Sequence, residues 1–217
     1  MIIAIDGPAA SGKGTLARRL AAHFGFAHLD TGKLYRAAAL HALESGGDPG
    51  DAAVAEAGAR KVRAGDLGDP RLIEERVAEA ASVVAAMPAV RAALIAFQRD
   101  FAQHPPGCAG AVLDGRDIGT VICPNAEAKF FVIASPEARA RRRYRELRDA
   151  GESAIYERVL QDMKNRDARD SARRTAPLVP AGDAFVLDTT ALDADAVFAI
   201  ALDHLGRLRI AKTPRSG

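Results

Sequence analysis

A glycine-rich stretch near the N-terminus, "GPAASGKGT" (residues 7–15), constrains the fold more than any other feature of the sequence. It follows a short apolar run, Met1–Ile5, which is typical of a buried strand. It precedes Leu16, Leu20 and Phe24, whose spacing of four residues predicts a helix. Glycine permits backbone turns that other residues resist. A strand, a glycine-rich turn and a helix in this order indicate an α/β fold.

The same stretch meets the requirements of a phosphate-binding loop. Backbone N–H groups can surround phosphate oxygens where side chains are small, and a helix that begins near Lys13 adds its positive end. The pattern is that of a P-loop, except that Gly14 separates Lys13 from Thr15. A glycine-rich turn without a ligand is the alternative. We expect Lys13 to be catalytic at the terminal phosphates and Thr15 to contact Mg²⁺. The residues expected to bind the nucleotide are Gly7, Pro8, Ala9, Ala10, Ser11, Gly12, Lys13, Gly14 and Thr15.

Short apolar runs alternate with helical segments along the rest of the chain. The runs that read as strands are residues 2–5, 27–29, 111–113, 129–134 and 184–187. This alternation predicts a parallel sheet of about five strands with helices on both faces, as in P-loop NTPases. Asp30 and Thr31 are expected to cap the helix that follows the second strand. The Gly-, Asp- and Pro-rich composition of residues 45–70 predicts loops and one weak helix. The pattern over residues 72–101 predicts two helices separated at Pro88.

Composition restricts the class of protein. Hydrophobic residues make up 48% of the 217 residues, and the 30 basic residues nearly balance the 28 acidic ones. This balance disfavours a nucleic-acid or membrane-surface protein. The N-terminus has no secretory pattern and no segment has the length of a membrane span. We therefore expect a cytoplasmic protein in which Cys108 and Cys123 are reduced thiols.

Three further motifs are rich in arginine. The stretch "DTGKLYR" follows the second strand, "LDGRDIGT" ends the third, and "RDARDSARR" precedes the last. Guanidinium groups bind phosphate oxygens bidentately, so these motifs suit an enzyme that brings two polyanions together. The residues of interest in these motifs are Arg36, Asp114, Arg116, Asp117, Arg166, Asp170 and Arg173.

The motifs together resemble the bacterial cytidylate kinases, a branch of the nucleoside monophosphate kinases. The resemblance rests on "GPAASGKGT", "DTGKLYRAAAL", "VRAAL", "DGRDIGTVICPNAEAKFF", "EARARRRYREL" and "RDARDSARRTAPLVPA". These stretches run from residue 2 to about residue 190, in the order of the family. The stretches "DGRDIGTV" and "RDARDSARRTAPL" are more specific than the P-loop, which many nucleotide-binding proteins share.

The resemblance implies an α/β kinase of P-loop NTPase type that transfers a phosphoryl group from Mg·ATP to CMP and dCMP. It implies contacts of Ser82, Arg91 and Asp117 with cytosine, and of Arg166 and Asp170 with the ribose. It assigns the acceptor phosphate to Arg36, Arg116 and Arg173, of which Arg116 and Arg173 are also expected to be catalytic. Thr31 is expected near the substrate.

Two groups allow a plainer interpretation as well. The segment "EARARRRYRELR" (residues 137–148) can be a solvated basic helix, or its inner arginines, Arg142 and Arg143, can contact ATP. Asp114 can simply close a strand, or it can lie near Mg²⁺. A nucleic-acid patch is disfavoured because no aromatic residues alternate with the arginines.

The resemblance also implies how the chain is divided into parts, and it implies a monomeric enzyme. We expect a core of residues 1–35, 108–142 and 176–210, a substrate-binding insert over about 36–107 and a mobile lid over about 143–175. The interval before Ser82 is shorter than in bacterial cytidylate kinases that carry β-strands there, so we expect a trimmed or mostly helical insert. The alternatives are a kinase for UMP or a shikimate-like acid, a GTPase-like switch and a nucleic-acid-binding ATPase.

Overall fold

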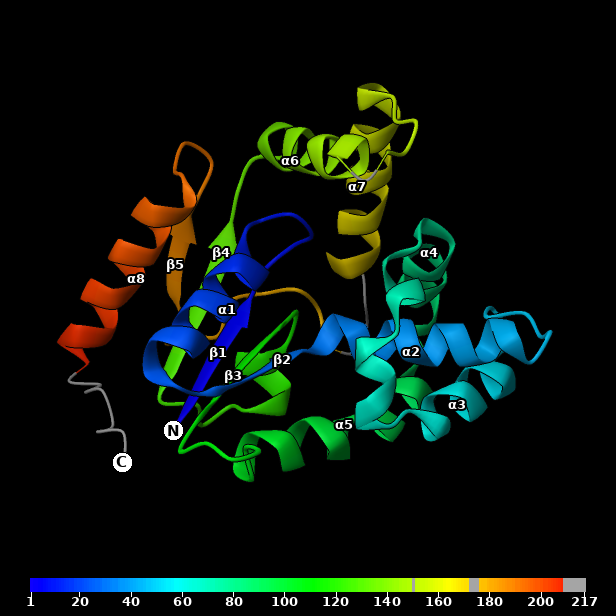
Figure 1. Ribbon diagram of the computed structural model, residues 1–217, viewed down its shortest axis with the longest axis horizontal. Coiled ribbons are helices and arrows are strands. Elements are labelled where there is room, and N and C mark those ends of the chain that lie inside the picture. The colour runs from blue at the N-terminus through cyan, green and yellow to red at the C-terminus, as the bar shows by residue number, and fades with distance from the viewer. Residues whose placement is uncertain (150, 172–175, 209–217) are drawn as a thin grey trace. The chain divides into compact units, whose positions relative to one another are not determined.

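The computed structural model describes residues 1–149, 151–171 and 176–208, which form two compact units. Unit 1 comprises residues 1–29 and the described residues from 102 onwards, and unit 2 comprises residues 30–101. The elements of unit 1 are β1 (Ile2–Asp6), α1 (Lys13–Phe24), β2 (Ala27–Asp30), β3 (Ala111–Gly115), the π-helical turn η3 (Ile118–Ile122), β4 (Ala128–Ile133), α6 (Pro136–Asp149), α7 (Tyr156–Ser171), β5 (Phe185–Asp188) and α8 (Ala194–Arg207), with β2 ending at the first residue of unit 2 (Figure 1).

A five-stranded sheet in the order β2-β3-β1-β4-β5 forms the centre of unit 1. Strand β1 pairs in parallel with β3 and with β4, and β4 pairs in parallel with β5. Helices lie on both sides of this sheet (Figure 1). The prediction of a five-stranded parallel sheet of α/β type is therefore confirmed, and each strand lies within about two residues of its expected bounds.

The core of unit 1 lies between this sheet and the helices α1 and α8. Ile3 and Ile5 of β1 are fully buried, as are Leu16 and Leu20 of α1, whose spacing of four places them on one helical face. Leu205 of α8 belongs to the same cluster. This packing fixes the end of β1 against the start of α1, and the P-loop joins them.

Unit 2 is helical apart from Asp30 and the connecting loops. Its elements are α2 (Thr31–Glu44), α3 (Ala52–Lys61), the 3₁₀ turns η1 (Ala64–Gly68) and η2 (Pro70–Ile73), α4 (Glu75–Val84) and α5 (Pro88–Gln103), whose last two residues belong to unit 1. The expected break at Pro88 is present, because Pro88 begins α5. The mostly helical character expected of this region is confirmed.

The first turn of α2 corrects one expectation. Asp30 alone is the N-cap, and its side chain accepts a hydrogen bond from the backbone N–H of Gly32 at 2.9 Å. Thr31, expected to share this role, is the first helical residue and is 3% exposed. The two residues compete for one cap position, and the aspartate occupies it.

None of the helices in the described part of the chain is by itself long and apolar enough to cross a membrane. Helices α4 and α5 reach the required length and composition only as a pair, which is bent by 101° at its break.

Gly58 allows α3 to pack closely on α2. A Cβ atom at this position would lie 2.5 Å from the carbonyl oxygen of Ala38 in α2. We expect Gly58→Ala to destabilise the protein by about 1–3 kcal/mol, because backbone must move to admit the methyl group. Thermal unfolding followed by circular dichroism measures the change. Gly206→Ala in α8 is the control, since a Cβ there meets nothing within 4 Å. Equal stability of the two variants would contradict the packing argument.

Candidate functional site

The predicted nucleotide-binding residues of unit 1 follow the carboxyl ends of its strands. In the sheet register Asp6, the last residue of β1, lies beside Gly115 of β3 and Phe131 of β4, and Ile133 lies beside Asp188 of β5. The segments after these strands therefore emerge along one edge. Ligands of open α/β sheets bind at such an edge.

The P-loop leaves β1 through a turn that only glycine can form. Gly7 has a φ of 153°, and a Cβ atom on it would lie 2.1 Å from the carbonyl oxygen of Val132. Gly12, the N-cap of α1, has a φ of 91°. Ala10 adopts a left-handed φ of 55°, a conformation that costs an alanine about 1–2 kcal/mol. Turns of this kind direct consecutive N–H groups into a concave anion site.

The carbonyl groups of the loop are bound from outside. Arg139 donates to the oxygen of Ala9 and Arg142 to that of Ala10, both at 3.4 Å, and the Thr189 hydroxyl donates to that of Ser11 at 2.9 Å. In a trans peptide the C=O and the next N–H point in opposite directions. The following N–H groups therefore point to the other side of the loop, where phosphate oxygens can accept from them.

Helix α6 divides its arginines between two faces. Arg141, Arg145 and Arg148 are exposed, as expected of a solvated basic helix. Arg139 is only 3% exposed and forms a bidentate ion pair with Asp167 of α7, with a closest distance of 2.6 Å. Arg142 lies three residues further along, and its Nη2 donates to the carbonyl oxygen of Thr189. The buried face of α6 thus supports the P-loop.

The contacts of the two predicted ATP-binding arginines differ. Arg142 contacts the P-loop, and burial lowers its pKa while Asp188 opposes that change. Arg143 lies 3.6 Å from Glu146 of the same helix. Both stay predictions as ATP contacts. The sequence did not single out Arg139, Thr189 or Asp167, because their partners are distant in sequence.

The side chains of Thr15 and Asp114, the two residues expected at Mg²⁺, both lie near the first turn of α1. A Cβ atom on Gly14 would lie 3.6 Å from Oδ2 of Asp114, so this carboxylate reaches the residue before Thr15. Asp114 is 2% exposed and its Oδ1 lies 2.8 Å from Nε2 of His28. Thr15 is exposed, and its hydroxyl accepts a hydrogen bond from Arg18 at 3.3 Å. Mg²⁺ needs one or two protein oxygens beside phosphates and water, so these residues fit it.

The "DGRD" segment after β3 places Arg116 against α7. Its Nε donates to Oδ2 of Asp170 at 2.9 Å, and Asp170 is 2% exposed. Two residues with separate predicted roles, at the acceptor phosphate and at the ribose, are thus paired. Arg166 lies one helical turn before Asp170 and is half-buried. Arg173 lies outside the described residues.

A buried carboxylate supports the same segment. Asp6 is 4% exposed, and it accepts hydrogen bonds from the backbone N–H groups of Ile118 at 2.8 Å and Gly119 at 2.7 Å. These residues directly follow Asp117, which is itself 4% exposed. Sequence reasoning missed Asp6 because it falls between the predicted strand and the P-loop, and its partners are more than a hundred residues away.

The pKa of Asp6 makes stability depend on pH. Burial raises this pKa from 3.8 to about 6, while the hydrogen bonds from Gly119 and Ile118 oppose the rise. The folded state holds the proton of Asp6 more tightly than the unfolded state does. The contribution of Asp6 to the free energy of unfolding is therefore fully present below pH 4 and is lost as the pH rises through about 6. The difference corresponds to about 3 kcal/mol. Relative to Asp6→Asn, the wild type should lose up to that amount between pH 4 and 7 in urea unfolding. Parallel profiles would contradict this.

Unit 2 contains the other predicted acceptor-binding residues. Ser82 of α4 is 5% exposed, and its Oγ has no hydrogen-bond partner among the described residues. Arg91 of α5 is 8% exposed and lies 5.9 Å from the centre of the Tyr35 ring. Arg36 donates to the carbonyl oxygen of Leu72 at 2.8 Å. A buried hydroxyl without a protein partner needs another one, such as a water molecule or a ligand.

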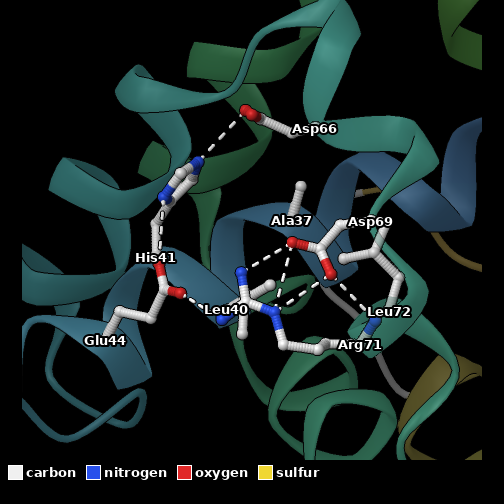
Figure 2. Close-up of a pocket in the computed structure, with 8 residues that line it drawn as sticks. All are labelled: Ala37, Leu40, His41, Glu44, Asp66, Asp69, Arg71 and Leu72. Atoms are coloured by element: carbon white, nitrogen blue, oxygen red, sulfur yellow. Dashed lines mark hydrogen bonds and ion pairs between the residues drawn. The ribbon is translucent and has the colours of Figure 1, made fainter.

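A pocket of about 80 Å³ lies on α2 and contains none of the predicted residues. Figure 2 shows the ion pairs of Arg71 with Glu44 and Asp69, and the hydrogen bond between His41 and Asp66. Hydrogen bonds from Arg71 lower the pKa of Asp69 to about 2. The volume is too small for a nucleotide, so we assign these pairs to the packing of the 3₁₀ turns on α2.

Known proteins resemble the chain over nearly its full length. The model of the family described as cytidylate kinase matches residues 3–207. A cytidylate kinase of Paramagnetospirillum magneticum is 59% identical, over 96% of this chain and 99% of that protein. One of Methylocella silvestris is 61% identical, over 93% of this chain and 92% of that protein.

A solved structure shares the fold. An uncharacterised protein from Eubacterium ventriosum superposes with a TM-score of 0.55 at 14% sequence identity, covering 95% of this chain and 98% of that one. At this identity the likeness shows the α/β fold alone.

Proposed function

Because the chain belongs to the cytidylate kinase family, we propose that it uses Mg·ATP to phosphorylate dCMP as well as CMP, through the residues assembled above. It is a nucleoside monophosphate kinase that transfers a phosphoryl group from ATP to CMP. One observation supports this assignment of residues most strongly. Arg139, Arg142 and Thr189 bind the carbonyl groups of the P-loop, and the "DGRD" segment follows β3 at the same edge of the sheet.

The donor side binds the phosphates of ATP through the N–H groups of the P-loop and through Lys13. Lys13 is the first residue of α1, so its ammonium group and the positive end of the helix act on the same phosphates. Arg139, Arg142 and Thr189 keep the loop in this shape. Arg142 and Arg143 are the proposed side-chain contacts to ATP.

Thr15 and Asp114 are the proposed residues at Mg²⁺. The ion would neutralise charge on the transferring phosphates, as in other phosphoryl-transfer enzymes. Asp114 is oriented by its contact with His28 at 2.8 Å. An orienting partner of this kind holds a carboxylate in one position before the ion arrives.

The acceptor base is recognised through its exocyclic amine. A cytosine amino group donates hydrogen bonds, and the carboxylate of Asp117 can accept one. Arg91 and the Ser82 hydroxyl can donate to the N3 and O2 acceptors. Uracil lacks the amine, so it would leave a buried carboxylate without its partner, which costs affinity.

The acceptor phosphate needs cations rather than a general base, since it is already an anion. Arg36, Arg116 and Arg173 are proposed to neutralise it, and Arg116 and Arg173 to stabilise the transferring group as well. Arg166 and Asp170 are proposed to bind the ribose. The pair between Arg116 and Asp170 would join phosphate and ribose recognition in one network.

The remaining parts of the proposal concern motion and assembly. Closure of a lid over about residues 143–175 would exclude water that hydrolyses ATP. A monomer suffices if all these groups come from one chain. We propose the cytoplasm as the location.

An acceptor panel tests this function. Purified protein with Mg·ATP is given CMP, dCMP, UMP, AMP, GMP or shikimate at matched concentrations, and release of ADP is measured. CMP and dCMP should lead clearly. A lead of UMP or shikimate would contradict the proposed use of Asp117, and ATP binding without transfer to any acceptor would contradict a kinase.

A further inference from the structure

The carboxylate of Asp6 links the strand that carries the P-loop with the segment that carries Arg116 and Asp117. Its Oδ1 accepts from the N–H of Ile118 at 2.8 Å, and its Oδ2 accepts from the N–H of Gly119 at 2.7 Å. The three residues belong to unit 1, and the bonds join positions 112 and 113 residues apart. Each carboxylate oxygen thus binds one amide, and the two bonds together fix the position and the orientation of the Ile118–Gly119 backbone.

These two amides open the π-helical turn η3. The first N–H groups of a helix have no partner within it, so they need an acceptor from elsewhere. The carbonyl oxygen of Asp117 accepts from the N–H groups of Val121 and Ile122, so the turn begins immediately after the predicted cytosine-binding side chain. π-helical turns occur frequently at functional sites.

Arg116 and Asp117 are held on both sides. The β1–β3 ladder pairs Asp6 with Gly115, the residue before them. The Asp6 side chain binds Ile118, the residue after them. Asp6 thus uses its backbone position and its carboxylate to fix the two ends of a two-residue segment.

The other end of η3 has a separate support. Lys129 of β4 donates to the carbonyl oxygen of Pro124 and to Asp183 at 2.8 Å. A Cβ atom on Gly119 would lie 3.2 Å from Cδ of Lys129 and 3.4 Å from Oδ2 of Asp6. The turn therefore lies close between the two side chains.

We propose that Asp6 is a positioning residue for the acceptor, which holds Arg116 and Asp117 in the arrangement that binds CMP before CMP arrives. The inference rests on the proposed roles of Arg116 and Asp117. Burial of the carboxylate is unfavourable, and the negative charge of Asp117 adds to this while Arg116 opposes it. Buried ionisable groups that are costly to charge cluster at functional sites.

Kinetics of Asp6→Asn test the proposal, with Asp203→Asn as the matched control. The amide oxygen can replace one acceptor of Asp6, but its NH₂ group cannot accept from the second N–H. Loss of one charge-assisted bond should raise KM for CMP about tenfold, while the Kd for ATP changes less than twofold. Asp203 is 63% exposed and pairs with Arg207 in α8, so its variant should keep both constants.

The outcomes distinguish failure of the proposed function from failure of the positioning role of Asp6. A wild-type protein that does not phosphorylate CMP overturns the proposed function itself. A wild type that does, with Asp6→Asn unchanged in KM for CMP, overturns only the role of Asp6. Equal loss of CMP and ATP binding also overturns it, because Asp6 would then support the P-loop.

If the Asp6→Asn variant does not fold, hydrogen exchange on the wild type tests whether the η3 amides are held before CMP binds. The amides of Ile118 and Gly119 should be protected in NMR spectra before CMP is added. Rapid exchange of both without CMP would overturn the prior positioning.

Discussion

Lys13→Ala should reduce kcat by about 10³-fold, the order of magnitude lost when one donor that stabilises transition-state charge is removed. Its ammonium is the charge that the P-loop supplies to the terminal phosphates. The fold should survive, because Lys13 begins α1 at a partly exposed position and alanine favours helix. Steady-state ADP release and circular dichroism measure the two effects.

The control for this variant is Lys61→Ala, which removes an exposed lysine from the last turn of α3. It should keep the wild-type kcat. A Lys13→Ala variant that turns over within about tenfold of wild type would remove Lys13 from the mechanism.

Asp117→Ala should lower kcat/KM for CMP by about 10³-fold and leave the Kd for ATP nearly unchanged. A site built to accept from a base amine loses several kcal/mol of discrimination when the acceptor is removed. Asp117 is 4% exposed and stands at the start of η3, so calorimetric titration with ATP must accompany the kinetics.

Asp203→Ala is the control for the second variant. Asp203 is 63% exposed and pairs with Arg207, four residues along in α8, so both constants should remain. If Asp117→Ala weakens ATP and CMP equally, its role is structural, and the assignment of the base-binding carboxylate is wrong.

The sheet could be predicted because its signals are local. Apolar runs of three to six residues, separated by segments of helical period, predicted all five strands, and Pro88 predicted the break before α5. The P-loop was equally visible, since Gly7 and Gly12 adopt the positive φ angles that their positions demanded. The capping position before α2 was ambiguous, because Asp30 and Thr31 are both good caps.

The supports of the site could not be predicted, because their partners are distant in the chain. Asp6 binds amides more than a hundred residues away, and Thr189 reaches Ser11 from the end of β5. Arg139 lies in a run of arginines that reads as solvated, although its side chain is buried against Asp167. Local pattern carries no information on such contacts. The role of each site residue stays a prediction.

Transfer of label from ATP to CMP tests the central claim most directly. The purified protein is incubated with CMP, Mg²⁺ and ATP labelled in its γ-phosphate, and the nucleotides are then separated. We expect the label in CDP, with ADP formed in equal amount. Label found in inorganic phosphate, or remaining in ATP, would contradict the account, because the site would then hydrolyse or only bind its donor.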